Sequence, residues 1–174
     1  MGEEQGFEAK EVDRSSVVKE MLKVFEEAVL PKLVAIPEDT KRYLYFIAWL
    51  NTFIEMRGLG RIIVTGGFAV EIYTARIYRT MDVDIIAEHC EGVVEEFLKS
   101  FSERIGRGYL PTYEVLSLKS IDIVSTTYTR RKQPTKMFIN NIYIHLDPVE
   151  DLIATYLAGS VGALQRIEIE HSGF

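Results

Sequence analysis

The segment Met81–Ala87 constrains the possible folds of this chain more than any other part of the sequence. It reads M-D-V-D-I-I-A, so acids alternate with apolar residues before the segment becomes fully apolar. Because successive side chains of a strand point to opposite faces, Asp82 and Asp84 would share one face. The apolar residues that would enter a core from the other face are Met81, Val83 and Ile85. The segment therefore predicts a strand that carries two carboxylates side by side.

A third acid lies inside another apolar segment, Ser120–Thr126, which reads S-I-D-I-V-S-T. If this segment is a strand beside the first, Asp122 joins Asp82 and Asp84. Like charges at close range resist simultaneous ionisation, and a hard divalent cation removes that cost. An isolated D-x-D is more often a pair of solvated acids at a strand end, but two such strands together favour a functional role. The sequence therefore predicts that Asp82, Asp84 and Asp122 bind Mg²⁺ (or Mn²⁺) and act catalytically, as in two-metal phosphoryl chemistry.

A glycine pair, Gly66-Gly67, follows the predicted strand Arg61–Thr65 and precedes the predicted helix Phe68–Arg76. Without side chains, the backbone N–H groups at a helix start can approach a phosphate, and Thr65 or Arg79 could assist. Glycines also occur at such turns for steric reasons alone. The pair is neither a Walker loop nor G-x-G-x-x-G, which disfavours P-loop and dinucleotide-binding folds. We expect a nucleotide-binding turn here.

Arg79 has a second interpretation, which the sequence alone leaves open. An Arg directly before an acidic strand could pair with Asp82 or Asp84 instead of binding a phosphate. A cluster of basic residues, Arg130–Lys136, could grip a triphosphate or an RNA, although such loops are more often only solvated.

The N-terminal part predicts a helical layer over residues 15–58, after a disordered lead-in at residues 1–14. One helix is expected over Ser15–Leu30, ended by Pro31, and a second over Pro37–Arg57. The stretch Tyr43–Ile54 is apolar nearly all round, so it needs cover on two sides. We expect the domain core on one side and a second subunit on the other, which makes a homodimer the predicted assembly.

Residues 59–174 predict a mixed sheet core and a C-terminal helix, so that residues 15–174 form a single domain of the α/β (α+β) class. The remaining expected elements are a helix over Val93–Phe101, strands over Tyr113–Leu118 and Asn141–Leu146, a tight turn at Asn140-Asn141 and a helix over Pro148–Leu164.

The composition narrows the function classes. The chain has 174 residues and a net charge of −6, which disfavours non-specific binding to nucleic-acid backbones by the whole surface. No apolar run is long enough to span a membrane. With Cys90 as its single cysteine, the sequence predicts neither an internal disulfide nor a structural zinc, and we expect a cytoplasmic location.

Three motifs occur in a fixed order: G-G-F-A-V at Gly66–Val70, R-T-M-D-V-D at Arg79–Asp84 and I-D-I at Ile121–Ile123. Together they resemble the nucleotidyltransferase superfamily that includes DNA polymerase beta, and most closely its small prokaryotic members. The resemblance implies a twisted mixed sheet flanked by helices. It also implies transfer of a nucleoside monophosphate from an NTP to a hydroxyl of an acceptor protein or RNA, with release of pyrophosphate. Many relatives have a Lys where this chain has Tyr156.

Two other functions stay open at this point. One is a catalytically silent binding module with the same fold, for example in a toxin-antitoxin pair, using Tyr43–Ile54 as its interface. The other is a D-x-D glycosyltransferase, in which the acid pair would hold a metal-bound nucleotide sugar. The intact carboxylates disfavour the first, and Asp122 would have no role in the second.

Overall fold

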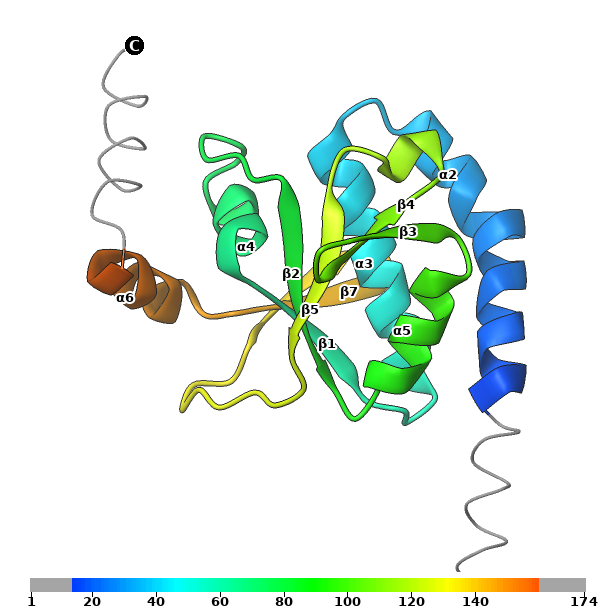
Figure 1. Ribbon diagram of the computed structural model, residues 1–174. Helices are drawn as coiled ribbons and strands as arrows, with labels where there is room; N and C mark the ends of the chain where they lie inside the picture. Colours follow the sequence, from blue (N-terminus) through cyan, green and yellow to red (C-terminus); the bar gives the residue numbers. More distant parts are fainter. Residues whose placement is uncertain (1–13, 160–174) are drawn as a thin grey trace, which may run out of the picture.

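The computed structural model describes residues 14–159 (Figure 1). Its sheet has seven strands in the order β3-β4-β5-β2-β1-β7-β6. The strands are β1 (Arg61–Thr65), β2 (Asp82–Glu88), β3 (Ser102–Ile105), β4 (Gly108–Pro111), β5 (Ser120–Ser125), β6 (Thr135–Ile139) and β7 (Ile142–Leu146). The three central strands include both of the predicted acid-bearing strands.

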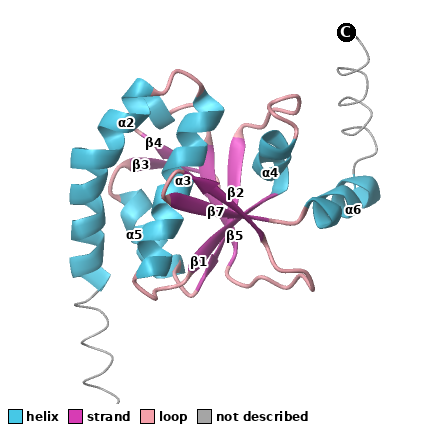
Figure 2. Ribbon diagram, turned by 180° about the vertical axis from the view of Figure 1, so that it is seen from behind, coloured by secondary structure: helices cyan, strands magenta, loops and turns pink. Residues whose placement is uncertain are grey.

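Helices lie on both sides of the sheet, as Figures 1 and 2 show from opposite directions. The N-terminal helical segment, α3 and α5 are on one side, and α4 and α6 are on the other. The helices are α2 (Leu30–Ala35), α3 (Asp39–Met56), α4 (Gly66–Tyr73), α5 (Glu91–Lys99) and α6 (Val149–Gly159), with a helical stretch over residues 14–24, a π-helix η1 (Phe25–Val29) and a 3-10 helix η2 (Glu114–Leu116).

The sheet is mixed. Strand β2 pairs antiparallel with β1 and parallel with β5, while β1 pairs parallel with β7. The two outer hairpins, β3–β4 and β6–β7, are antiparallel. This arrangement confirms the predicted class, an α+β fold with a mixed sheet flanked by helices.

The N-terminal helix does not end at Pro31, as the sequence had suggested. Helical structure runs through residues 14–35, and Pro31 lies in the first turn of α2. The preceding turn, Phe25–Val29, is a π-helix. A proline removes one N–H and its ring clashes with the carbonyl four residues earlier, and the wider π turn accommodates both effects. Of the predicted lead-in, only Arg14 lies within the described residues, and it is helical.

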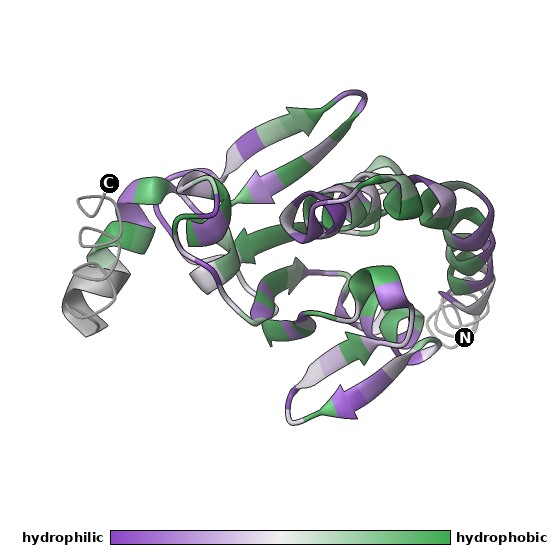
Figure 3. Cartoon of the chain, turned by 90° about the horizontal axis from the view of Figure 1, so that it is seen from above, coloured by the Kyte–Doolittle hydropathy of each residue, from purple (hydrophilic) through white to green (hydrophobic). Residues whose placement is uncertain are grey.

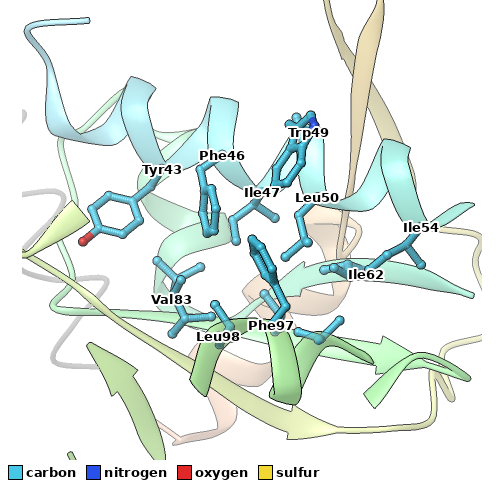
Figure 4. Packing of buried hydrophobic residues seen from close by; sticks show 14 of the residues in the cluster. Tyr43, Phe46, Ile47, Trp49, Leu50, Ile54, Ile62, Val83, Phe97 and Leu98 are labelled. Carbon is cyan, nitrogen blue, oxygen red and sulfur yellow. The ribbon is translucent and has the colours of Figure 1, made fainter. Parts of the chain in front are cut away.

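Helix α3 is covered on two sides by the chain itself. Its apolar side chains pack against strand residues such as Val83 and against Phe97 of α5 (Figure 4). On another side Phe25 lies fully buried, with its ring 5.5 Å from that of Phe46 and 5.9 Å from that of Trp49. Residues 14–35 therefore provide the cover for which the sequence analysis invoked a second subunit, and the homodimer stays a prediction.

The sheet edges differ most from the sequence-based expectation. The predicted strand Tyr113–Leu118 is wrong, since this segment forms η2 and loops, whereas β3, β4 and β6 were missed. Two hairpins stand out from the rest of the molecule in Figure 3, and both carry hydrophilic segments.

The predicted C-terminal helix begins at Val149, and its part beyond residue 159 lies outside the described residues. Within residues 14–159, no helix is long and apolar enough to cross a membrane.

Candidate functional site

The three predicted acids lie on neighbouring strands and on one face of the sheet. In the parallel pairing of β2 with β5, Asp84 is the partner of Asp122, and Asp82 is the partner of Ser120. On the opposite face, Val83, Ile85 and Ile121 are fully buried. The prediction that the acids adjoin on one face is confirmed.

Met81 does not belong to that buried face, because β2 begins only at Asp82. The side chain of Met81 is 73% exposed, so its predicted place in the core was wrong.

Ser120 links two of the carboxylates. Its hydroxyl lies 2.7 Å from Oδ1 of Asp82 and 3.4 Å from Oδ1 of Asp122. A hydroxyl has one proton to donate, so the shorter contact is the main hydrogen bond and fixes the orientation of Asp82. Ser120 is a site residue that the sequence did not single out.

The carboxylates affect one another electrostatically. Burial, followed by the charges of Asp122 and Asp82, raises the pKa of Asp84 to about 6. Burial and the charge of Asp82 also raise the pKa of Asp122, against the hydrogen bond from Ser120 and the charges of Arg104 and Arg107. Three acids this close together repel one another, so a cation beside them would stabilise their charged forms.

The glycine pair contacts the acidic face directly, where the acidic face is the sheet surface that carries Asp82, Asp84 and Asp122. Gly66 has a φ of +62°, and a Cβ on this residue would lie 2.6 Å from Oδ2 of Asp84. A Cβ on Gly67 would lie 2.8 Å from Oγ1 of Thr80. Only glycines let the start of α4 pack this closely against the start of β2, and no side chain caps the N-terminus of that helix.

Thr65 is on the same rung as Asp84, in the antiparallel pairing of β1 with β2. Its hydroxyl donates a hydrogen bond to Oδ2 of Asp147, at 2.6 Å, so it is not free to donate to a phosphate. Asp147 follows β7, is fully buried and also pairs with Arg130 at 3.3 Å. Its other oxygen, Oδ1, has no hydrogen-bond partner among the described residues. Asp147 was missed, although an acid directly before Pro148 at the end of an apolar strand was a usable signal.

Arg79 pairs with neither Asp82 nor Asp84, so that structural interpretation was wrong. Its guanidinium lies 2.6 Å from Oδ2 of Asp39 and 3.5 Å from Oε1 of Glu71. The side chain is still 45% exposed, and both of its partners are carboxylates. A role in phosphate binding stays a prediction.

The donor set suits a magnesium ion only in part. Carboxylate oxygens are its preferred ligands, and the residue packed against Oδ2 of Asp84, Gly66, has no side chain. However, no three His, Cys, Asp or Glu side chains within residues 14–159 are close enough together to hold a metal. Asp82, Asp84 and Asp122 therefore do not come together as one three-carboxylate metal group. Magnesium commonly binds through one or two carboxylates, water and substrate phosphates, which this face could supply with an NTP.

Comparisons of the chain with protein-family models, with curated proteins and with solved structures found no match. Tyr156, the predicted departure from a basic residue, lies on α6 beyond the last side chain that the structure describes.

Proposed function

We propose that this protein is a metal-dependent nucleotidyltransferase that moves a nucleoside monophosphate from an NTP to a hydroxyl of an acceptor protein or RNA. The observation that carries the proposal is the pairing of Asp84 with Asp122 on neighbouring parallel strands, with Gly66 packed against Asp84. This arrangement places a pair of adjacent carboxylates at the start of α4, one of them directly against its backbone. An acid pair that only faced solvent would not require a glycine beside it.

The residues of the acidic face take distinct roles in the proposed reaction. Asp82 and Asp84 would hold Mg²⁺ or Mn²⁺, with water and the substrate phosphates as the other ligands. When bound, the cation supplies Lewis-acid stabilisation of the charge that develops on the phosphate oxygens. Ser120 keeps Asp82 oriented through its 2.7 Å hydrogen bond. The backbone N–H groups at the start of α4 bind the terminal phosphates.

Proton transfer falls to Asp122. The acceptor hydroxyl oxygen attacks the α-phosphorus, and the bond from that phosphorus to the bridging oxygen of the β-phosphate breaks. Pyrophosphate leaves, and the hydroxyl proton passes to Asp122. Its position on the neighbouring strand, paired with Asp84, is what assigns this role to Asp122.

The test is nucleotide transfer by the purified protein with Mn²⁺ and each labelled NTP, offered RNA and the proteins of a cell extract as acceptors. We expect labelled product from the wild type and none from Asp82→Asn or Asp84→Asn. Glu103→Gln, which changes an exposed acid on the edge strand β3, is the control and should retain transfer. The same metal and NTP should raise the melting temperature, since a ligand at a hundredfold excess over Kd adds about 2.7 kcal/mol of stability.

A second function, that of a silent binding module, is favoured by one observation. The described residues contain no group of three side chains placed to hold a metal. Absence of labelled product with all NTPs and acceptors, together with unchanged melting, would make this the better assignment.

A further inference from the structure

Glu71, on α4, is fully buried yet ionic, and the proposed reaction does not use it. Its Oε1 accepts hydrogen bonds from Nζ of Lys119 and from the backbone N–H of Thr80, both at 2.9 Å. Its Oε2 accepts a hydrogen bond from Oγ1 of Thr40 at 2.7 Å. Both carboxylate oxygens are therefore held by three different segments of the chain.

Lys119 is the counter-charge of Glu71 and is only 2% exposed. Its ammonium also donates a hydrogen bond to the backbone carbonyl of Thr80. The N–H of Thr80 donates a hydrogen bond to Glu71, so the ion pair holds both backbone polar groups of Thr80. Thr80 is two positions before Asp82, and Lys119 is three positions before Asp122.

These contacts join the three segments that build the acidic face. Glu71 belongs to the helix that begins at Gly66, and the other two residues precede β2 and β5. The first rung between those strands is the hydrogen bond from the N–H of Ser120 to the carbonyl of Met81, at 3.2 Å. The ion pair lies directly beside this rung.

We propose that Glu71 and Lys119 are positioning residues, whose ion pair fixes the starts of β2 and β5 against α4 and so sets the spacing of the three carboxylates. The effect on metal binding and transfer rests on the proposed function. The effect on strand positions does not, and it can be measured separately.

A purely stabilising role accounts less well for a buried pair of this kind. Burying two charges costs desolvation, and apolar or neutral residues of similar shape are often as stabilising. Charged hydrogen bonds are short and directional, so they restrict the positions of the groups that they join. The geometry held here is that of the two peptide units on either side of the Thr80 Cα, next to the acids.

The experiment compares the wild type with the double variant Glu71→Gln/Lys119→Met. The glutamine oxygen still accepts the N–H of Thr80, while both charges and the bond to the Thr80 carbonyl are lost together, so no buried charge is left unpaired. We measure melting temperature, hydrogen exchange of the Ser120 amide, affinity for Mn²⁺ alone and the rate of transfer. If this variant does not fold, Lys119→Arg replaces it, since a planar guanidinium cannot reproduce the ammonium geometry.

The control is Arg61→Met/Glu88→Gln. This removes a partly buried ion pair of 2.9 Å that joins β1 to the far end of β2, away from the acids. We expect the control to leave three quantities unchanged: the hydrogen-exchange rate of the Ser120 amide, the Mn²⁺ affinity and the transfer rate.

We expect the Glu71/Lys119 variant to melt close to the wild type but to exchange the Ser120 amide about tenfold faster. Its Mn²⁺ affinity and transfer rate should fall by about 10-fold to 100-fold, as for other residues that orient metal ligands. Unchanged exchange and unchanged affinity would overturn the inference. A wild type without Asp84-dependent Mn²⁺ binding would instead overturn the proposed function, and faster Ser120 exchange in the variant would then still support the positioning of the strands.

Discussion

Asp84 and Asp122 are direct partners across the parallel pairing of β2 with β5, so two carboxylates share one face of the sheet at adjacent positions. Burial and the charges of Asp122 and Asp82 raise the pKa of Asp84 to about 6. The chain thus keeps an arrangement that works against its own stability at neutral pH. Such local cost is typical of sites where function, not folding, has determined the side chains.

Replacing Asp84 by Asn should stabilise the protein without metal at pH 7. The pKa of Asp84 is raised from 3.8 in the unfolded chain to about 6, so the folded state binds more protons between these values. Stability of the wild type therefore falls as the pH rises from about 4 to about 6, and the full cost remains above pH 6. With a discount for partial exposure, we expect Asp84→Asn to gain about 1 to 2 kcal/mol at pH 7 and nothing at pH 3.5.

Urea unfolding of both proteins at a series of pH values measures this difference. The gain should appear across the window from pH 4 to pH 6 and then stay constant. A variant that is less stable than the wild type at pH 7 would show that Asp84 makes a structural contribution that the structure does not reveal.

Replacing Gly66 by Ala tests the close approach of α4 to Asp84. The residue has a φ of +62°, and the new Cβ would lie 2.6 Å from Oδ2 of Asp84. Gly58 is the matched control, because it has a φ of +67° but no atom within 4 Å of a new Cβ. Gly58→Ala should cost about 1 kcal/mol from backbone strain alone, and Gly66→Ala should cost more. Gly66→Ala should also abolish Mn²⁺ binding, whereas equal costs and intact Mn²⁺ binding would remove the steric argument.

The sequence predicted the central strands and the acidic face because their alternation of acid and apolar residues reports the two faces of a strand directly. The sequence could not supply the register in which β2 and β5 pair. A shift of one residue between β2 and β5 would have turned Asp122 to the opposite face, and only packing of the whole sheet decides this. The neighbouring positions of Asp84 and Asp122 were thus a conditional expectation.

The sequence did not allow the buried charges or the short edge strands to be predicted, for different reasons. Glu71 and Lys119 resemble ordinary surface charges in their local sequence, and their burial depends on α3, α4 and β5 meeting at one place. The strand β3 has the sequence S-E-R-I, which lacks a run of apolar residues, so only the turn glycine Gly106, with a φ of +58°, marked the hairpin.

The N-terminal helical segment should be part of the core and not an accessory. Phe25 is fully buried, and its ring stacks on that of Phe101 at 5.2 Å, between α3 and α5. We expect Phe25→Ala to lower the free energy of unfolding by about 3 to 5 kcal/mol, measured by urea denaturation. Val34→Ala, at a side chain that is 67% exposed, is the control and should change it by less than about 0.5 kcal/mol. A loss below about 1 kcal/mol at Phe25 would mean that the segment contributes little to folding.

Thr65 should support the fold more than it supports nucleotide binding. Its hydroxyl is committed to Oδ2 of Asp147 at 2.6 Å, and a hydroxyl cannot donate its single proton twice. Thr65→Val keeps the shape of the side chain but leaves a fully buried carboxylate with one hydrogen bond fewer. We expect a loss of about 1 to 3 kcal/mol in unfolding free energy. Thr65→Ser, which retains the hydroxyl, should lose less.

The affinity for an NTP with Mn²⁺ should separate the two possible roles of Thr65. If the hydroxyl serves only Asp147, Thr65→Val should bind the nucleotide within about threefold of the wild type at a temperature where both are folded. A hydroxyl that binds a phosphate would instead contribute about 1 kcal/mol or more to binding, so its removal would weaken affinity about fivefold or more. That result would require the side chain to leave Asp147 when the nucleotide binds. The buried Oδ1 of Asp147 already lacks a partner among the described residues, so this move would leave Arg130 as the one remaining side chain hydrogen-bonded to that carboxylate within residues 14–159.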